Sequence, residues 1–206
     1  MIRNFTTALF INFLMSVSIV SFGQTEKGNM LLGGGIDLGS TTYRYDNFED
    51  QKVFSLNINP GLSYLLTDNV ALGIILPISF SNQTQNGLAD RKSQSLAFGP
   101  KLRYYIPFDR WAVFPEIEYT MGIGQFDTFI FDTTAGGLIL SNEKYSTSNL
   151  SIGAGLTYFL SQSIAVESIL SYNKSYTNYD SDGLSDLETT SIGFGVGFQI
   201  YFQTKK

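Results

Sequence analysis

Five charged residues stand at alternate positions in segments that otherwise carry many apolar side chains. They are Lys101, Arg103, Glu116, Glu118 and Glu167. The first two precede a short turn centred near Asp109, and Glu116 and Glu118 follow it. Alternate residues of a β-strand share one face, and a tight turn folds two such strands against each other. The spacing therefore predicts that the charges of this hairpin lie close together, with Glu167 on the same inward side.

Three kinds of chemistry fit such a cluster. An unpaired buried charge is costly, so we favour a network of ion pairs that neutralises the charges and ties neighbouring strands together. A gate that opens when the charges exchange partners is one alternative. A pair of catalytic carboxylates is another.

The composition argues against most other site chemistry. The chain contains no histidine, the usual base that activates serine or water, and no cysteine for a thiolate metal site, a disulfide or a lipid anchor. We therefore expect no catalytic residue, no cofactor and no metal site, and we expect that the protein is not an enzyme. The acidic residues 180–188 suggest calcium as an alternative, but their spacing departs from an EF-hand and favours a solvated loop.

The segments that carry these charges are strands, because apolar residues recur with a period of two. In residues 191–202, large apolar side chains alternate with small or polar ones such as Gly193, Gly195, Gly197 and Gln199. Eight segments show this alternation. Their approximate spans are 29–44, 53–66, 70–83, 94–107, 112–127, 147–160, 164–177 and 189–203.

The connections between these segments alternate in length. Residues 67–69, 108–110 and 161–163 are tight turns with Asp, Asn or Ser, and residues 45–52, 84–93, 128–146 and 178–188 are longer and more polar. Short turns on one side and long loops on the other are typical of bacterial membrane barrels. The pattern predicts an all-β protein, an eight-stranded antiparallel up-and-down transmembrane β-barrel. A soluble lipocalin-like carrier, with its apolar face inward, is the rival fold.

Some details of the strands are less regular. Pro60, Pro77, Pro100 and Pro115 fall inside predicted strands, and we expect them at bulges or strand ends. Alternation continues through residues 128–146, which predicts a long hairpin that rises above the membrane and turns near residues 134–137. Aromatic residues near strand ends predict girdles at the membrane interfaces. These are Tyr43, Tyr45, Tyr105, Trp111, Tyr172, Tyr176 and Tyr179.

The N-terminus has the features of a secretory signal. Arg3 is followed by an apolar run near residues 8–20 and by Ser21-Phe22-Gly23, which predicts a signal peptide at residues 1–23 and a barrel domain at residues 24–206. The mean hydropathy is only +0.04, as expected when lipid-facing and inward residues alternate. A net charge of −5 with no basic cluster makes nucleic acid an unexpected partner.

Together, the signal peptide, the eight alternating strands, the loop pattern and the aromatic last strand resemble the small outer-membrane β-barrel family that includes OmpX, OmpW and the membrane domain of OmpA. The resemblance covers the whole chain after the signal peptide. It implies a location in the bacterial outer membrane, insertion by the barrel assembly machinery, and a role in adhesion, envelope integrity or passage of small solutes. Phe202 matches the terminal aromatic residue of the family, although residues 203–206 follow it.

We therefore expect a non-enzymatic outer-membrane barrel with a structural, envelope-integrity or surface-interaction role. The alternative is a narrow channel or a lateral transporter for small or hydrophobic solutes, for which an interrupted strand ladder would be needed. The expected partners are outer-membrane lipids, the barrel assembly machinery during insertion, and an extracellular partner that contacts the loops, above all residues 128–146.

Overall fold

The computed structural model describes residues 23–45, 48–85, 89–132, 136–181 and 185–203. The predicted signal peptide, apart from Gly23, therefore lies outside the described residues. The elements are η1 (Gly23–Thr25), β1 (Met30–Tyr45), β2 (Phe48–Thr67), β3 (Val70–Ile75), β4 (Ile78–Gln85), β5 (Arg91–Tyr104), β6 (Ile106–Phe108), β7 (Trp111–Asp132), β8 (Gly137–Phe159), β9 (Ile164–Tyr179) and β10 (Leu187–Phe202). Within these ranges, no helix has the length and apolar character needed to cross a membrane.

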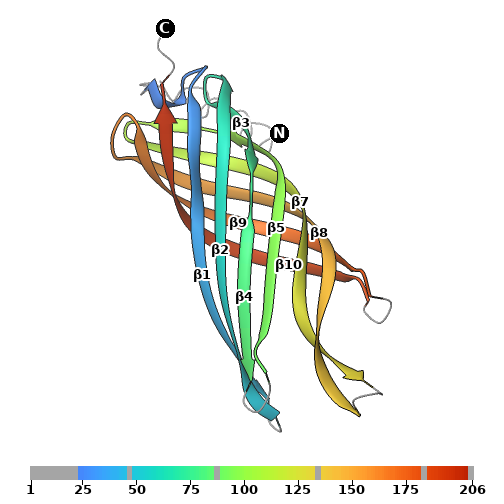
Figure 1. Cartoon of the computed structure of the whole chain (residues 1–206). Coiled ribbons are helices and arrows are strands. Elements are labelled where there is room, and N and C mark those ends of the chain that lie inside the picture. Colours follow the sequence, from blue (N-terminus) through green and yellow to red (C-terminus); the bar gives the residue numbers. More distant parts are fainter. Residues whose placement is uncertain (1–22, 46–47, 86–88, 133–135, 182–184, 204–206) are drawn as a thin grey trace, which may run out of the picture.

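The ten strand segments make eight strands of one antiparallel barrel (Figure 1). β3 and β4 are parts of one strand interrupted at Pro77, which lacks an N–H group for the ladder. β5 and β6 are likewise separated at Tyr105, whose N–H donates instead to the Asn69 carbonyl at 2.7 Å. Consecutive strands pair around the barrel, and β10 pairs with β1 to close it. The predicted eight-stranded up-and-down barrel is confirmed.

Tight turns gather at the end of the barrel where β10 finishes (Figure 1). Asn69, between β2 and β3, and Asp109, between β6 and β7, have φ angles of 70° and 51°. Asparagine and aspartate tolerate this left-handed backbone better than most residues, which explains why these types occupy the turns. The longer connections lie at the other end, as the sequence predicts.

Several strands extend further than the alternation indicates. β1 and β2 pair as far as Tyr45 and Phe48, inside a predicted loop, and β7 and β8 pair as far as Asp132 and Gly137. These terminal residue pairs lie beyond the apolar belt. Their side chains therefore need not alternate between apolar and polar types. The predicted long hairpin of residues 128–146 is confirmed, and its turn at residues 133–135 lies outside the described part of the chain.

The outer face of the barrel is apolar. On β10, Ile192, Phe194 and Phe198 are 76%, 68% and 61% exposed, whereas Tyr201 points inward and is 1% exposed. From Ile192 to Phe202 the strand covers about 33 Å, or about 25 Å along the membrane normal at the usual tilt of about 40°. This height matches the apolar band of a membrane barrel. The lipocalin-like alternative, with its apolar face inward, is wrong.

Prolines disturb the strands less than predicted. Pro77 does end a strand, but Pro60, Pro100 and Pro115 lie inside continuous strands without a register shift. The β5–β7 ladder skips Pro100, yet the strands stay close there, because a Cβ at Gly99 would overlap the carbonyl oxygen of Tyr119. The expectation of bulges at these three prolines is wrong.

One interruption in the wall arises elsewhere. β1 and β10 form six residue pairs, from Met30 with Phe202 to Gly35 with Gly197. Beyond this point, residues 36–45 of β1 and residues 187–196 of β10, all within the described ranges, form no pair with each other. We call this interruption the seam. β1 and β10 diverge there toward the long-loop end (Figure 1).

Candidate functional site in the barrel lumen

The five predicted charges meet in the lumen. Lys101 and Arg103 come from β5, Glu116 and Glu118 from β7, and Glu167 from β9. Lys101 is paired across the β5–β7 ladder with Glu118, and Arg103 with Glu116, so the hairpin places opposite charges side by side. The structure thus brings all five side chains into one cluster, which we call the charge network.

Arg103 is the centre of the charge network. Its Nε donates to Glu116 Oε2 at 2.6 Å, and its Nη1 lies 2.7 Å from both carboxylate oxygens of Glu167. Its guanidinium carbon also lies 3.8 Å from the ring centre of Phe114. Arg103 is 6% exposed, so these contacts replace the water that a buried guanidinium loses.

Lys101 is held more loosely. Its Nζ lies 3.8 Å from Glu116 Oε2 and 3.9 Å from Glu118 Oε1, beyond hydrogen-bonding distance. The Glu118 side chain is also more exposed than that of Glu116, at 17% against 5%. The network therefore has a tight half at Arg103 and a loose half that faces the interior space.

Sequence analysis missed the neutral members of the network. Glu167 accepts hydrogen bonds from Thr157 Oγ1 at 2.9 Å and Gln199 Nε2 at 3.1 Å, which come from the strands on either side of β9. Arg103 also donates to the Tyr105 hydroxyl at 2.9 Å. The alternation places all of these side chains inward, but only the register between strands determines that they meet Glu167 or Arg103.

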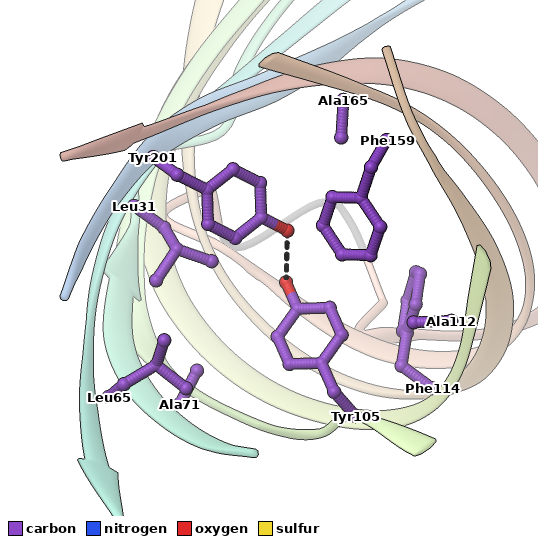
Figure 2. Packing of buried hydrophobic residues seen from close by; sticks show 9 residues of the cluster. All are labelled: Leu31, Leu65, Ala71, Tyr105, Ala112, Phe114, Phe159, Ala165 and Tyr201. Carbon is purple, nitrogen blue, oxygen red and sulfur yellow. Dashed lines mark hydrogen bonds between the residues drawn. The ribbon is translucent and has the colours of Figure 1, made fainter. Parts of the chain in front are cut away.

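A layer of apolar and aromatic side chains packs together inside the barrel (Figure 2). Tyr105 and Phe114 of this layer contact Arg103, and the Tyr105 N–H bonds to Asn69 in a tight turn, so the layer lies between the network and the tight turns. We call this layer the floor, and each of its residues is at most 4% exposed. It consists of Leu31, Leu65, Ala71, Tyr105, Ala112, Phe114, Phe159, Ala165 and Tyr201. The hydroxyl of Tyr201 donates to that of Tyr105 at 3.3 Å, as Figure 2 shows. The prediction of Tyr105 as a girdle residue is wrong, because its strand parity turns it into the floor.

Glycines at inward positions leave space for the large side chains in and beside the floor. A Cβ at Gly155 would overlap the ring of Phe114, so glycine at this inward position is what lets the ring cross the lumen. Similarly, a Cβ at Gly33 would overlap the side chain of Gln199. Inward glycines at this level therefore accommodate large neighbours rather than leave holes.

On the other side of the network lies a cavity of about 530 Å³. The network forms part of its wall, together with amide and hydroxyl side chains such as Asn57, Asn149 and Ser171 and the glycines of β10. Its lining includes four carboxylates, those of Asp37, Glu116, Glu118 and Glu167, against two cations, Lys101 and Arg103. Asp37 accepts a hydrogen bond from Asn59 at 3.2 Å. The cavity is polar, and acidic residues outnumber basic ones in its lining.

A family model for the outer membrane protein beta-barrel domain matches residues 12–199. The chain belongs to this family. As an outer-membrane β-barrel, it lies in the bacterial outer membrane. No curated protein matches its sequence.

Solved structures support the fold of this outer-membrane β-barrel. OprG of Pseudomonas aeruginosa aligns with a TM-score of 0.50 and 14% identity, over 89% of this chain and all of OprG. The translocator domain of the autotransporter NalP of Neisseria meningitidis also gives 0.50 and 14%, over 95% of this chain and 69% of that one. At these identities the likeness concerns the fold alone.

Three of the other residues predicted for the aromatic girdles lie on the outer face of the outer-membrane β-barrel. Trp111, Tyr172 and Tyr176 are 40–50% exposed on the outer face, as girdle residues should be. Tyr179 instead packs with Phe126 and Tyr145 at centroid distances of 5.5 and 6.2 Å, so its prediction as a girdle residue is wrong. The side chains of Tyr43 and Tyr45 lie outside the described residues.

The possible metal ligands among His, Cys, Asp and Glu in the described part of this barrel are carboxylates, because the chain has no histidine and no cysteine. No group of three or more His, Cys, Asp or Glu residues there is placed to hold a metal ion. The acidic stretch of residues 180–188 is only partly described, since residues 182–184 fall outside the structure. The arrangement of the lumen can neutralise buried charge, block passage at the floor and hold polar groups in the cavity.

Proposed function

We propose that this outer-membrane β-barrel is a non-enzymatic surface-interaction protein whose β7–β8 hairpin contacts an extracellular partner. The observation that carries the proposal is the floor. Its side chains fill the lumen beside a hydrogen-bonded charge network, which argues against a through-going channel. A barrel without a channel anchors the chain in the membrane. The segments outside the membrane then make its contacts with other molecules.

The β7–β8 hairpin pairs the two longest strands of the described residues, β7 with 22 and β8 with 23 residues. Phe129 pairs with Leu140 about 20 Å beyond Ile123, the last strongly exposed apolar residue of β7 in the belt. Polar residues such as Asn142 and Ser146 separate this end from the membrane, yet Ile139 and Leu140 are 38% and 44% exposed. Exposed apolar side chains at the end of a polar hairpin suit a protein partner.

The edges of the hairpin support the same role. The β5–β7 ladder ends at Ser93 with Phe126, and the β8–β9 ladder ends at Tyr145 with Tyr179. Within the described residues, the hairpin beyond these pairs therefore presents two strand edges without a neighbouring strand. Such edges allow another chain to add a strand.

The test replaces residues 130–139 with Asn-Gly, so that a two-residue turn joins the paired Phe129 and Leu140. Cells carrying the shortened barrel should lose adherence or self-aggregation that wild-type cells show, while the barrel keeps its heat-modifiable gel mobility. Ile139→Ser is the matched control for the apolar end alone. Unchanged surface phenotypes with an intact barrel would refute the role of the hairpin.

Conductance in planar bilayers tests the closed lumen separately. Refolded wild-type protein, Glu116→Gln and Glu118→Gln should all be silent, because none of these changes removes the floor. Discrete conductance that the two variants alter would instead favour the narrow, gated channel.

The seam favours a second candidate, a lateral transporter for hydrophobic solutes. Exposed apolar residues flank it, among them Leu38 and Ile192 at 70% and 76%, and the cavity is lined by Phe194 and Val196 beside it. A Cβ at Gly195 would lie 3.2 Å from Asp37 Oδ1, so positions 37 and 195 face each other across the seam. A cysteine pair at these positions, joined by a short reducible thiol crosslinker, should lower the uptake of a hydrophobic solute, and reduction of the crosslinker should restore it. Uptake that the crosslink leaves unchanged would exclude the lateral route through the seam.

A further inference from the structure

A short segment ahead of the first strand is docked onto the tight-turn end of the barrel. It comprises residues 24–29, begins in η1 and leads into β1 (Figure 1). Gln24, Thr25 and Asn29 are each at most 4% exposed, although residues of these polar types are mostly exposed in proteins. The barrel end therefore covers this segment, which we call the strap.

The strap is bound to tight turns on opposite sides of the barrel. On one side, the Thr25 carbonyl accepts a hydrogen bond from the Asn69 N–H at 2.8 Å. On the other side, Gln24 Nε2 donates to the Ser161 carbonyl at 3.2 Å. Asn69 belongs to the turn between β2 and β3, and Ser161 to the turn between β8 and β9, halfway round the ring of strands. The strap therefore spans the end of the barrel.

The strap adds a second connection between β1 and β10, the two strands that close the barrel. Their direct pairing ends at Gly35 with Gly197. The β8–β9 turn that accepts from Gln24 also holds β10, because its Ser163 carbonyl accepts from the Tyr201 N–H at 2.8 Å. β1 is thus joined to β10 by its own ladder and also, through the strap and this turn, by a route across the barrel end.

The hydrogen bonding of the docked strap is incomplete. Gln24 Oε1 and Thr25 Oγ1 are buried, and neither has a hydrogen-bond partner in the described part of the chain. Each such atom raises the free energy of the docked state, because it would be hydrogen-bonded to water if the strap were free. Segments with few stabilising contacts detach without global unfolding. The strap should therefore detach more readily than a strand of the barrel.

We propose that the strap controls the closure of the barrel. While the strap is docked, the turn-end part of the β1–β10 ladder stays shut, and only the seam beyond Gly35 is open. When the strap detaches, β1 keeps only its six residue pairs with β10, and this ladder separates more often. The strap thus sets how far the opening at the seam extends toward the turn end. This inference does not depend on the hairpin's role or on the passage of a solute.

Hydrogen exchange measured by mass spectrometry tests the proposal on protein purified from outer membranes. Gln24→Glu keeps the size of the side chain but places an acceptor opposite the Ser161 carbonyl and an unpaired charge in a buried position. Exchange should therefore rise at least about tenfold in residues 30–35 and 197–202. It should rise equally at the Asn69 amide, which reports docking of the strap.

Thr25→Val provides the opposite perturbation, because it removes a buried, unpaired hydroxyl and keeps the shape of the side chain. Exchange at the same positions should slow about fivefold. Glu26→Gln is the matched control, because Glu26 is an exposed strap residue and its side chain can change without burial of a charge. The intact mass of each variant verifies that residues 24–29 are present.

Each outcome decides the proposal. Opposite effects of Gln24→Glu and Thr25→Val on the β1–β10 ladder, with no change in Glu26→Gln or in the β7–β8 ladder, support it. Faster exchange at Asn69 alone would show that the strap detaches without controlling closure, and would overturn the proposal. An equal rise in the β7–β8 ladder would indicate general destabilisation and overturn it as well. Faster exchange in Thr25→Val would contradict the incomplete hydrogen bonding on which release depends.

Discussion

Arg103 should be the residue on which the stability of the charge network depends most. Arg103→Met keeps the length of the side chain but leaves Glu116 and Glu167, both buried, without their nearest cation. Breaking a buried ion pair from one side costs about 3–5 kcal/mol, so we expect the free energy of unfolding to fall by about 4 kcal/mol. Glu167→Gln should cost about 3 kcal/mol, because Arg103 retains Glu116.

The coupling between the two sites is the sharper quantity. When Arg103→Met and Glu167→Gln are combined, fewer charges remain unpaired than in Arg103→Met alone. The double variant should therefore lose about 4–5 kcal/mol rather than the sum of the single losses, a coupling of about 2–3 kcal/mol. Glu118→Gln serves as the control and should change stability by less than about 1 kcal/mol, since Lys101 lies 3.9 Å away and the side chain is 17% exposed.

Urea unfolding of protein refolded into lipid vesicles measures these differences. Trp111 is the only tryptophan of the chain and packs at 4.5 Å against Tyr158 near a tight turn, so its fluorescence reports loss of the folded barrel. Unfolding and refolding curves must coincide for the free energies to be valid. Additive losses within about 0.5 kcal/mol, or equal losses for Arg103→Met and Glu118→Gln, would refute the central role of Arg103.

Three further predictions concern the floor and the rim. Gly155→Ala should destabilise the barrel by about 1–3 kcal/mol in the same urea assay, because the new methyl group meets both the Phe114 ring and the Ser168 carbonyl oxygen. Phe114→Leu should restore only the part of the loss that the ring causes. Tyr105→Phe should cost about 1 kcal/mol by removing a buried hydroxyl that pairs with Arg103, and an unchanged unfolding midpoint would contradict this. At the rim, hydrogen bonds from the Asn142 side chain and the Lys92 N–H hold the pKa of Asp127 below its usual range. The hydrogen bonds of Asp127 should therefore persist above the ordinary aspartate pKa of about 3.9 and be lost only as the pH falls through the lowered pKa. An NMR titration of the Lys92 amide measures this loss. A midpoint at or above about 3.9 would show that these hydrogen bonds do not stabilise the carboxylate.

The alternation of side chains was enough to predict most of the architecture. In a barrel the side-chain period is two, so each residue's parity determines whether it meets lipid or lumen, and this holds for Leu96, Ile117 and Ile192 on the outside and for Glu116 and Glu167 on the inside. Tyr105 shows the limit of judging by position along the strand. Its nearness to a turn suggested a girdle, but its parity with Arg103 puts it in the floor.

Contacts between strands that are distant in sequence could be decided only by the tertiary structure. Arg103 and Glu167 are 64 residues apart and Gln199 lies 32 residues beyond Glu167, so the register and tilt of the closed barrel determine that they meet. The floor depends on the same geometry, because the Phe114 ring fills the space that Gly155 leaves on the neighbouring strand. The seam also follows from how far β1 and β10 stay paired, which no local pattern encodes. The sequence by itself thus determined the class of fold, the membrane and the facing of most residues, whereas the closure of the lumen and its openings were decided by long-range packing.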